Sequence, residues 1–281
     1  MREFCYRRGR FLLGEKPYIM GIVNVTPDSF SDGGKFFRAE KAAEHARSLE
    51  NQGADILDFG AMSTRPGSSP VTPEEEIKRL EPVLSEIVGK TNAVVSVDTV
   101  NPETAEFALR LGADIINDVS GYFNPSMADT VKKYGAGWIV THTGCVPAGT
   151  VLEYPKGVIY AVNEFFSHMT AQCEQYGIDK KFLCLDPGFG FAKTVDDNIE
   201  LLKNLEAVIS DTAFLTGLSR KRFIGALTNE EKAEKRLIGT VAADIVAVMK
   251  GSDFIRVHDV KEARQSLDVL AAIRNGDIHY G

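Results

Sequence analysis

The sequence predicts an α/β protein with the fold of a (β/α)8 barrel, in which eight parallel strands close into a ring and helices cover the outside. Eight continuous apolar runs alternate with helix-like segments, a pattern typical of a parallel sheet covered on both faces. Seven of these runs end in a polar residue capable of chemistry. The length of 281 residues is close to the ~250 residues usual for this barrel. The alternative is an open, doubly wound sheet, which typically has fewer strands.

The expected elements follow one another along the whole chain. The apolar runs are 18–25, 54–60, 93–99, 114–121, 137–143, 182–188, 213–220 and 254–259. The helix-like segments include 38–52, 74–88, 102–111, 157–176 and 231–250. Capping or first-turn signatures open several of them, such as TPEEE at Thr72 and NPETA at Asn101. Before the first run, the stretch GRFLLGEKPY predicts a hairpin that covers the barrel floor.

Composition agrees with a single domain over residues 1–281 and argues against several classes of function. No Pro/Gly/Ser-rich linker divides the chain. The net charge of −7 and the lack of a strongly basic run argue against a nucleic-acid partner. No apolar stretch approaches the ~20 residues of a membrane span, and the N-terminus has no apolar signal core. The four cysteines have neither paired nor CxxC spacing, which indicates a reduced, cytoplasmic enzyme without disulfides or structural zinc.

Polar residues at the strand ends predict where the active site lies. In a parallel barrel all strands point the same way, so residues at their C-terminal ends converge on one rim although they are far apart in sequence. A single strand-end Asn or His is more often a satisfied structural group, so the prediction depends on the convergence of many. The residues concerned are Asn24, Asp98, Asn117, His142, Asp186, Lys221 and His258.

Two connections on this rim are longer than usual. NVTPDSFSDGGKF follows the first apolar run, and GAMSTRPGSSPVTPEEE follows the second. Both are rich in Gly, Ser, Pro and Asp, so ordinary polar turns are the alternative interpretation. Each nevertheless carries a residue that a turn does not need, Phe30 in the first and Arg65 in the second. We therefore expect two mobile flaps that close over a flat, anionic ligand.

A first group of rim residues is suited to phosphate. Arg256 and His258 lie two residues apart on an expected strand, so their side chains point to the same face. Together with Arg65 they form a cluster of donors for phosphate oxygens. Magnesium takes only one or two protein oxygens when phosphates and water complete its octahedron, so we expect Asn24 to anchor Mg2+.

A second group, Asp98, Asn117, Asp186 and Lys221, suits a different ligand. Two carboxylates, an amide and an ammonium fit the polar edge of a planar heterocycle with adjacent N–H groups. One alternative is a salt-bridged barrel interior without a ligand. Another is a Schiff base on Lys221, but that residue lies between two arginines, which favours anion binding.

These motifs together resemble the dihydropteroate synthase family, the folate-pathway enzymes targeted by sulfonamides. They run from Gly21 to Val260 and read, in order, GIVNVTPDSFSDGG, STRPG, SVDT, INDVSG, LDPGFGF, SRKRFIG and RVHDV. The resemblance implies a (β/α)8 barrel and a transferase. That enzyme condenses 6-hydroxymethyl-7,8-dihydropterin pyrophosphate with 4-aminobenzoate and releases pyrophosphate with Mg2+. It also implies a homodimer.

The resemblance further implies a role for each matching residue. The pterin would be bound by Asp98, Asn117, Asp186 and Lys221. Pyrophosphate and its metal would be bound by Asn24, Arg65, Arg256 and His258. The aminobenzoate pocket would be lined by Phe30, Thr64, Pro66, Phe191 and Ser219. In catalysis, the two arginines and His258 would stabilise the leaving group, Asp98 would oppose the charge of a pterin cation, and Lys221 would act through its charge and hydrogen bonds.

The sequence departs from the family pattern at two places. Gly60, Ala61 and Met62 stand in place of Gly-Gly-Glu, which removes a carboxylate near the second flap. Thr141, His142 and Thr143 stand in place of Met-His-Met, which makes the pterin-side wall more polar. Two other functions share parts of the pattern. One is a pterin-binding methyltransferase, which would not need STRPG, SRK or the Arg256/His258 pair, and the other is a noncatalytic pterin-binding module.

Overall fold

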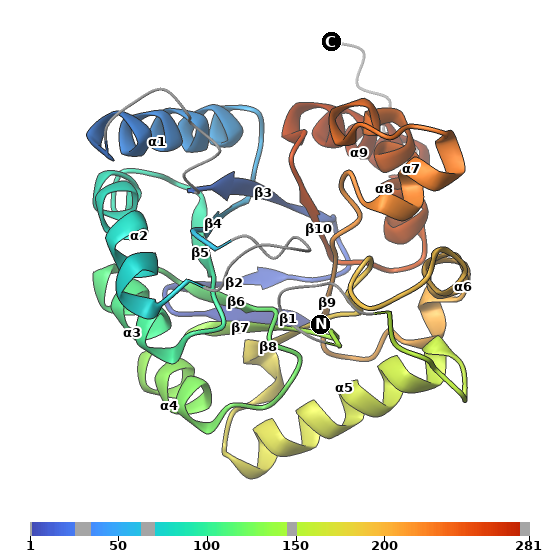
Figure 1. Ribbon diagram of the computed structural model, residues 1–281, viewed down its shortest axis with the longest axis horizontal. Helices are drawn as coiled ribbons and strands as arrows, with labels where there is room; N and C mark the ends of the chain where they lie inside the picture. The colour runs from blue at the N-terminus through green and yellow to red at the C-terminus, as the bar shows by residue number, and fades with distance from the viewer. Residues whose placement is uncertain (1, 26–34, 63–70, 145–150, 276–281) are drawn as a thin grey trace.

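Eight parallel strands form a closed barrel within the part of the chain that the computed structural model describes, residues 2–25, 35–62, 71–144 and 151–275. The order around the barrel is β10-β3-β4-β5-β6-β7-β8-β9, and helices surround it (Figure 1). The barrel strands are β3 (Tyr18–Asn24), β4 (Ile56–Gly60), β5 (Val94–Asp98), β6 (Ile115–Asp118), β7 (Gly137–Thr141), β8 (Leu183–Asp186), β9 (Ala213–Thr216) and β10 (Phe254–Val257). The predicted fold class is therefore confirmed, and the open sheet is excluded.

A helix follows each barrel strand. The helices are α1 (Lys35–Asn51), α2 (Pro73–Ile87), α3 (Pro102–Leu111), α4 (Pro125–Tyr134), α5 (Val158–Gln175), α6 (Val195–Lys203), α7 (Arg222–Thr228), α8 (Leu237–Met249) and α9 (Val260–Asn275). The hydroxyl of Thr72 caps α2 by accepting from the Glu75 amide. Asn101 does not cap α3 with its side chain, which donates instead to Glu76, but Pro102 opens the helix as expected. Among the described helices, none is long and apolar enough to cross a membrane.

The predicted helix over 231–250 begins later than expected. α8 starts at Leu237, and the charged stretch before it forms a turn and a short 3-10 helix. The cause is Arg236, whose guanidinium donates to the backbone carbonyls of Arg220, Glu230 and Glu231. A chain held in this way turns back on itself instead of continuing the helix.

Alternating side chains divide the barrel into an inner and an outer face. Outward residues such as Val95, Trp138 and Phe214 pack with the helices in one large core. Inward residues at the N-terminal ends of the strands form a separate apolar layer at the bottom of the barrel, made of Met20, Ile56, Val94, Ile115, Ile139, Cys184, Ala213, Leu215 and Phe254. Polar inward residues therefore begin one layer higher.

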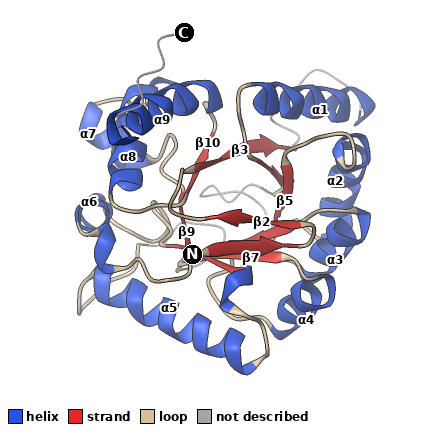
Figure 2. Cartoon of the chain, turned by 180° about the vertical axis from the view of Figure 1, so that it is seen from behind, coloured by secondary structure: helices blue, strands red, loops and turns tan. Residues whose placement is uncertain are grey.

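A hairpin covers this bottom layer, as predicted, but it starts earlier than the stretch GRFLLGEKPY. It consists of β1 (Glu3–Tyr6) and β2 (Gly9–Leu12), which pair antiparallel. In both ribbon views the hairpin lies across the ring of strands (Figures 1 and 2). Phe4 and Phe11 pack on Phe254 with ring centroids 5.6 and 5.3 Å apart.

Two ion pairs fasten the hairpin region to the barrel. Arg2 binds Asp253 at 2.8 Å, and Arg8 binds Asp114 at 2.7 Å, each through two hydrogen bonds. Both aspartates are almost fully buried and also accept a backbone N–H from a barrel strand. The floor is thus closed by apolar packing and by paired charges.

Candidate active site

The second inward layer of the barrel, above the apolar one, is polar. Each of its residues lies two positions beyond an inward apolar residue of the same strand, so the side chains point into the barrel. The layer contains Asp58 on β4, Ser96 on β5, Asn117 on β6, Thr141 on β7, Asp186 on β8 and Arg256 on β10. All of these except Arg256 are buried. Of the strand-end residues predicted to converge, Asn117 and Asp186 lie in this layer.

Asp58 is the centre of this layer. It was not predicted from the sequence, because it lies inside a strand and not at a strand end. Its carboxylate accepts from the Ser96 hydroxyl at 2.7 Å, the Asn117 amide at 3.0 Å and Arg256 Nε at 2.7 Å. A charged residue within the apolar run ADILDFG, on the inward phase of the strand, was the signal that could have revealed it.

Arg256 joins Asp58 to Asp98. Its Nε donates to Asp58, and its Nη2 donates to Asp98 at 2.7 Å. The expectation was that Arg256 faces pyrophosphate, whereas two of its three nitrogens are engaged by carboxylates, which leaves Nη1 for a ligand. Burial raises the pKa of Asp98 to about 7, although the Arg256 charge opposes this rise. Of the four residues for which a salt-bridged interior was considered, Asp98 is thus in an ion pair, and its partner is Arg256.

Other residues of the layer offer polar atoms that have no hydrogen-bond partner among the described residues. The Asn117 amide nitrogen donates to Asp58, and its carbonyl oxygen is buried without a hydrogen bond in the described structure. Asp186 accepts from the Gly188 amide with Oδ1 only. Burial raises the pKa of Asp186, while this bond and Lys221 lower it. Acceptors of this kind suit the N–H groups of a heterocycle.

Lys221 lies just past β9, at the N-terminal end of α7. Its Nζ is 4.3 Å from the centroid of the Phe191 ring, which is a cation–π contact. A Cβ on Gly190 would come within 2.9 Å of the Lys221 side chain, so the glycine leaves room for it. Burial lowers the pKa of Lys221 to about 8, and the Asp186 charge works in the opposite direction.

His142 does not reach the rim with the other predicted residues. It is buried, and its Nδ1 lies 2.9 Å from Lys193 Nζ. Lys193, which was not predicted, also donates to the carbonyls of Gly188 and Phe191 at 3.0 and 3.3 Å. Burial lowers the pKa of Lys193 to about 7 and that of His142 to about 3. This pair fixes the loop after β8, which carries Phe191.

Ser219 and His258 meet above β9 and β10. The Ser219 hydroxyl is 3.0 Å from His258 Nδ1 and accepts from the His258 amide at 3.2 Å. The next residue, Arg220, has a positive φ of 58° and binds Asp259 through two hydrogen bonds. Arg220 thus turns away toward Asp259, which leaves Ser219 and Lys221 on either side of it at the rim.

Asn24 ends β3 at the same rim, and its side chain forms no hydrogen bond to another described residue. Within the described part of the chain no three His, Cys, Asp or Glu side chains gather in a way that could hold a metal ion. A single amide oxygen fits Mg2+ only where a substrate diphosphate and water supply the other ligands. Phe30, Thr64, Arg65 and Pro66 lie outside the described residues.

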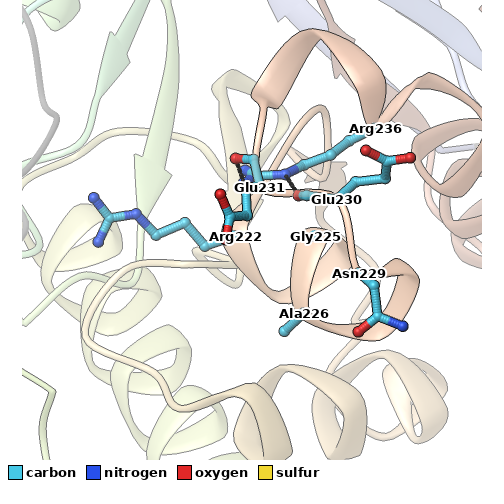
Figure 3. Close-up of a pocket in the computed structure, with 7 residues that line it drawn as sticks. All are labelled: Arg222, Gly225, Ala226, Asn229, Glu230, Glu231 and Arg236. Atoms are coloured by element: carbon cyan, nitrogen blue, oxygen red, sulfur yellow. Dashed lines mark hydrogen bonds between the residues drawn. The ribbon is translucent and has the colours of Figure 1, made fainter.

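A separate pocket of about 530 Å3 lies beside α7, on the turn that precedes α8 (Figure 3). Arg236 reaches across it to the carbonyls of Glu230 and Glu231, while Arg222 points away from Arg236. Because the Arg236 guanidinium is fully occupied by backbone carbonyls, this pocket offers little to a ligand. The barrel mouth, where the converging polar groups lie, is the better candidate.

The fold and the site define a class of protein, a closed parallel barrel with a layer of polar side chains in its interior. The sequence model of the pterin binding enzyme family matches residues 20–258, and the chain belongs to this family. It is 41% identical over 270 residues to the dihydropteroate synthase of Escherichia coli strain K12, with 95% of each chain covered.

Solved structures agree with the sequence comparison. The dihydropteroate synthase of Xanthomonas albilineans with 4-aminobenzoic acid superposes with a TM-score of 0.87 at 41% identity, covering 92% of this chain and 94% of that one. The Xanthomonas albilineans enzyme in complex with 7,8-dihydropteroate gives a TM-score of 0.85 at 39% identity, covering 94% and 96%.

Proposed function

We propose that this chain catalyses the dihydropteroate synthase reaction, the transfer of a dihydropterin methylene group to 4-aminobenzoate with release of pyrophosphate. The observation that carries the proposal is that Asn117 Oδ1 and one oxygen of Asp186 accept no hydrogen bond from another described residue, beneath a rim that presents Lys221, Ser219 and His258. Relatives with this activity match nearly the whole chain.

The pterin would lie on the polar layer, with its N–H groups on Asn117 and Asp186. Lys221 would approach it from the rim, and the Phe191 ring holds the Lys221 ammonium in place. As the bond to pyrophosphate breaks, positive charge develops on the pterin. Asp98 is positioned to oppose that charge in its ionised form, which Arg256 favours.

The leaving pyrophosphate would be bound by Arg65 and His258, with the free Nη1 of Arg256 below them. Asn24 would hold Mg2+, which when bound neutralises charge on the diphosphate. An arylamine is neutral at pH 7, so the attack on the methylene group needs no strong base. The aminobenzoate would stand above the pterin, in a pocket lined by Phe30, Thr64, Pro66, Phe191 and Ser219.

We further propose a cytoplasmic homodimer. The described cysteines, Cys5, Cys173 and Cys184, are free thiols, which is consistent with a reducing compartment. Large apolar side chains are exposed on the adjacent helices α8 and α9, and they are Ile238, Met249, Val269 and Ile273. Exposed apolar groups concentrated on neighbouring helices are typical of a subunit interface.

The function is tested by supplying both substrates with Mg2+ and measuring pyrophosphate and 7,8-dihydropteroate together. We expect equal amounts of the two products, and none when either substrate is omitted. Pyrophosphate without 4-aminobenzoate would indicate hydrolysis. No product from a protein that still binds a pterin would indicate a methyltransferase or a binding module instead.

A further inference from the structure

Thr141 is an inward residue of the barrel for which the proposed function gives no role. It ends β7, two positions after Ile139, which belongs to the apolar bottom layer. Its partner in register on β8 is Asp186, whereas Asn117 on β6 is level with Ile139, two residues before Thr141. Thr141 therefore lies beside Asp186 and one step above Asn117.

The hydroxyl of Thr141 is buried and has no hydrogen-bond partner among the described residues. Its methyl group lies on the side of Gly188, because a Cβ added there would be 3.2 Å from Thr141 Cγ2. A buried hydroxyl without a partner has lost its hydrogen bonds to water and has gained none in the fold. The Thr141 hydroxyl is therefore unfavourable in the free protein unless a ligand forms a hydrogen bond with it.

The hydrogen-bonding groups of Asn117, Thr141 and Asp186 indicate what the Thr141 hydroxyl binds. Asn117 Oδ1 and the free oxygen of Asp186 accept hydrogen bonds only, whereas a threonine hydroxyl can also donate one. Thr141 and Asp186 are register partners on adjacent strands about 4.8 Å apart, so their side chains can contact one planar ligand. The matching ligand edge has an acceptor atom beside an N–H group.

We propose that Thr141 is a substrate-binding residue that determines specificity, donating a hydrogen bond to a ring nitrogen or carbonyl oxygen of the pterin. This inference rests on the proposed function, since it needs a pterin on the polar layer. The hydroxyl stands where the family pattern has methionine, so it replaces an apolar contact by a directional one.

Thr141→Val tests the proposal because valine keeps the shape and removes only the hydroxyl. We expect a pterin fragment, 6-hydroxymethylpterin, to bind about tenfold more weakly to the variant by calorimetry. The thermal midpoint of the free protein should stay equal or rise, since the lost hydroxyl formed no bond there. Thr141→Ser should keep most of the affinity.

Thr216→Val is the matched control. Thr216 is a buried residue near the end of β9, but its hydroxyl forms a hydrogen bond of 3.0 Å with Ser252 on the outer side of the barrel. Its replacement should lower the thermal midpoint and leave pterin affinity unchanged. The two variants thus give opposite patterns.

Equal pterin affinity of wild type and Thr141→Val would overturn the inference, and so would a variant that loses stability but no affinity. These results leave the proposed function intact, because the wild type still binds the pterin. If the wild type binds no pterin fragment, both the proposed function and this inference fail.

Discussion

Asp58 organises several ligand-binding groups although it need not touch the ligand. Its carboxylate accepts from the Asn117 amide nitrogen, which fixes the orientation of that amide, and it holds Arg256 against Asp98. Removing one partner of a buried charge pair leaves the other uncompensated, which is more damaging than losing a neutral hydrogen bond. The stability of the site and its binding pattern therefore depend on the same carboxylate.

Asp58→Asn should lower the free energy of unfolding by about 3 kcal/mol, because Arg256 loses the fully buried one of its two counter-charges. The variant should also bind a pterin fragment more weakly, since the Asn117 amide loses the acceptor that orients it. Chemical denaturation and calorimetry measure the two effects. Ser96→Ala is the control, and it should cost only about 1 kcal/mol as it removes one neutral donor. Equal effects of both variants would contradict a central role for Asp58.

Asp244 on α8 is a second buried carboxyl, and neither of its oxygens has a hydrogen-bond partner in the described structure. Burial raises its pKa well above the usual value, and the charge of Asp259 adds to the effect. The folded state therefore keeps a proton that the unfolded state has already lost above about pH 4. Stability consequently falls as pH rises above that value.

Asp244→Ala should raise the free energy of unfolding by about 1 kcal/mol or more, because a buried unpaired group is removed. The gain should be larger at pH 8 than at pH 5, since only the wild type has to keep a proton on folding, and the cost of keeping it grows as pH rises. Denaturation curves at the two pH values test this. Asp244→Asn should abolish the pH dependence of the Asp244 contribution but retain an unpaired polar group. A gain that is equal at both pH values would show that Asp244 is not protonated in the fold.

At the level of elements, strand positions were predictable because each strand is a continuous apolar run bounded by turn residues. Helix ends were less so, since α8 begins where Arg236 binds three carbonyls, and no local pattern encodes such contacts. The same limit applies within the site. Strand-end residues such as Asn117 and Asp186 could be found from topology, whereas Lys193 could not, because its partners come from two different loops.

The hairpin of β1 and β2 should contribute stability without contributing to binding. Phe4 is fully buried against Phe254, so Phe4→Ala should cost about 3 kcal/mol. Affinity for a pterin fragment should not change, as the apolar layer separates Phe4 from the polar one. Arg10→Ala, which breaks an exposed pair with Glu3, should have almost no effect on either quantity. A large loss of affinity in the folded Phe4 variant would mean that the floor also shapes the site.

The loop after β8 depends on Lys193, which holds His142 and the carbonyls of Gly188 and Phe191. Lys193→Met should raise KM for 4-aminobenzoate several-fold, because Phe191 is no longer fixed, while Lys203→Met on the exposed end of α6 should not. The pKa of Lys193 falls to about 7 on folding, so the unfolded state holds more protons above this pH. Wild-type stability should therefore gain up to about 1.4 kcal/mol per pH unit from about pH 7 to 10, and the variant should lack this gain. If the variant showed an unchanged KM and an unchanged pH dependence of stability, Lys193 would not hold the loop after β8.

At the scale of the molecule, the helices around the barrel are not equivalent. Ile273 on α9 is 75% exposed, and Arg274 beside it donates to the Val248 carbonyl, which brings this end of α9 next to the end of α8 and Met249. Ile273→Lys should convert a dimer into a monomer, measured by light scattering over a range of concentrations. The monomer should remain folded, because the side chain supports no core packing. Tyr122→Lys, at an exposed apolar position after β6, should leave the dimer intact. A wild-type monomer at every concentration would refute the proposed interface.

The closed floor determines the order in which ligands enter and leave the barrel. A tube sealed at one end by Phe4, Phe11 and the layer around Phe254 is loaded and emptied through the same opening. The ligand that binds deepest in the barrel has to bind first, and a ligand bound above it blocks its dissociation. Escape of the lower compound is then delayed for as long as the upper one stays. This order of binding and release requires no conformational change, since it follows from the shape of the barrel alone.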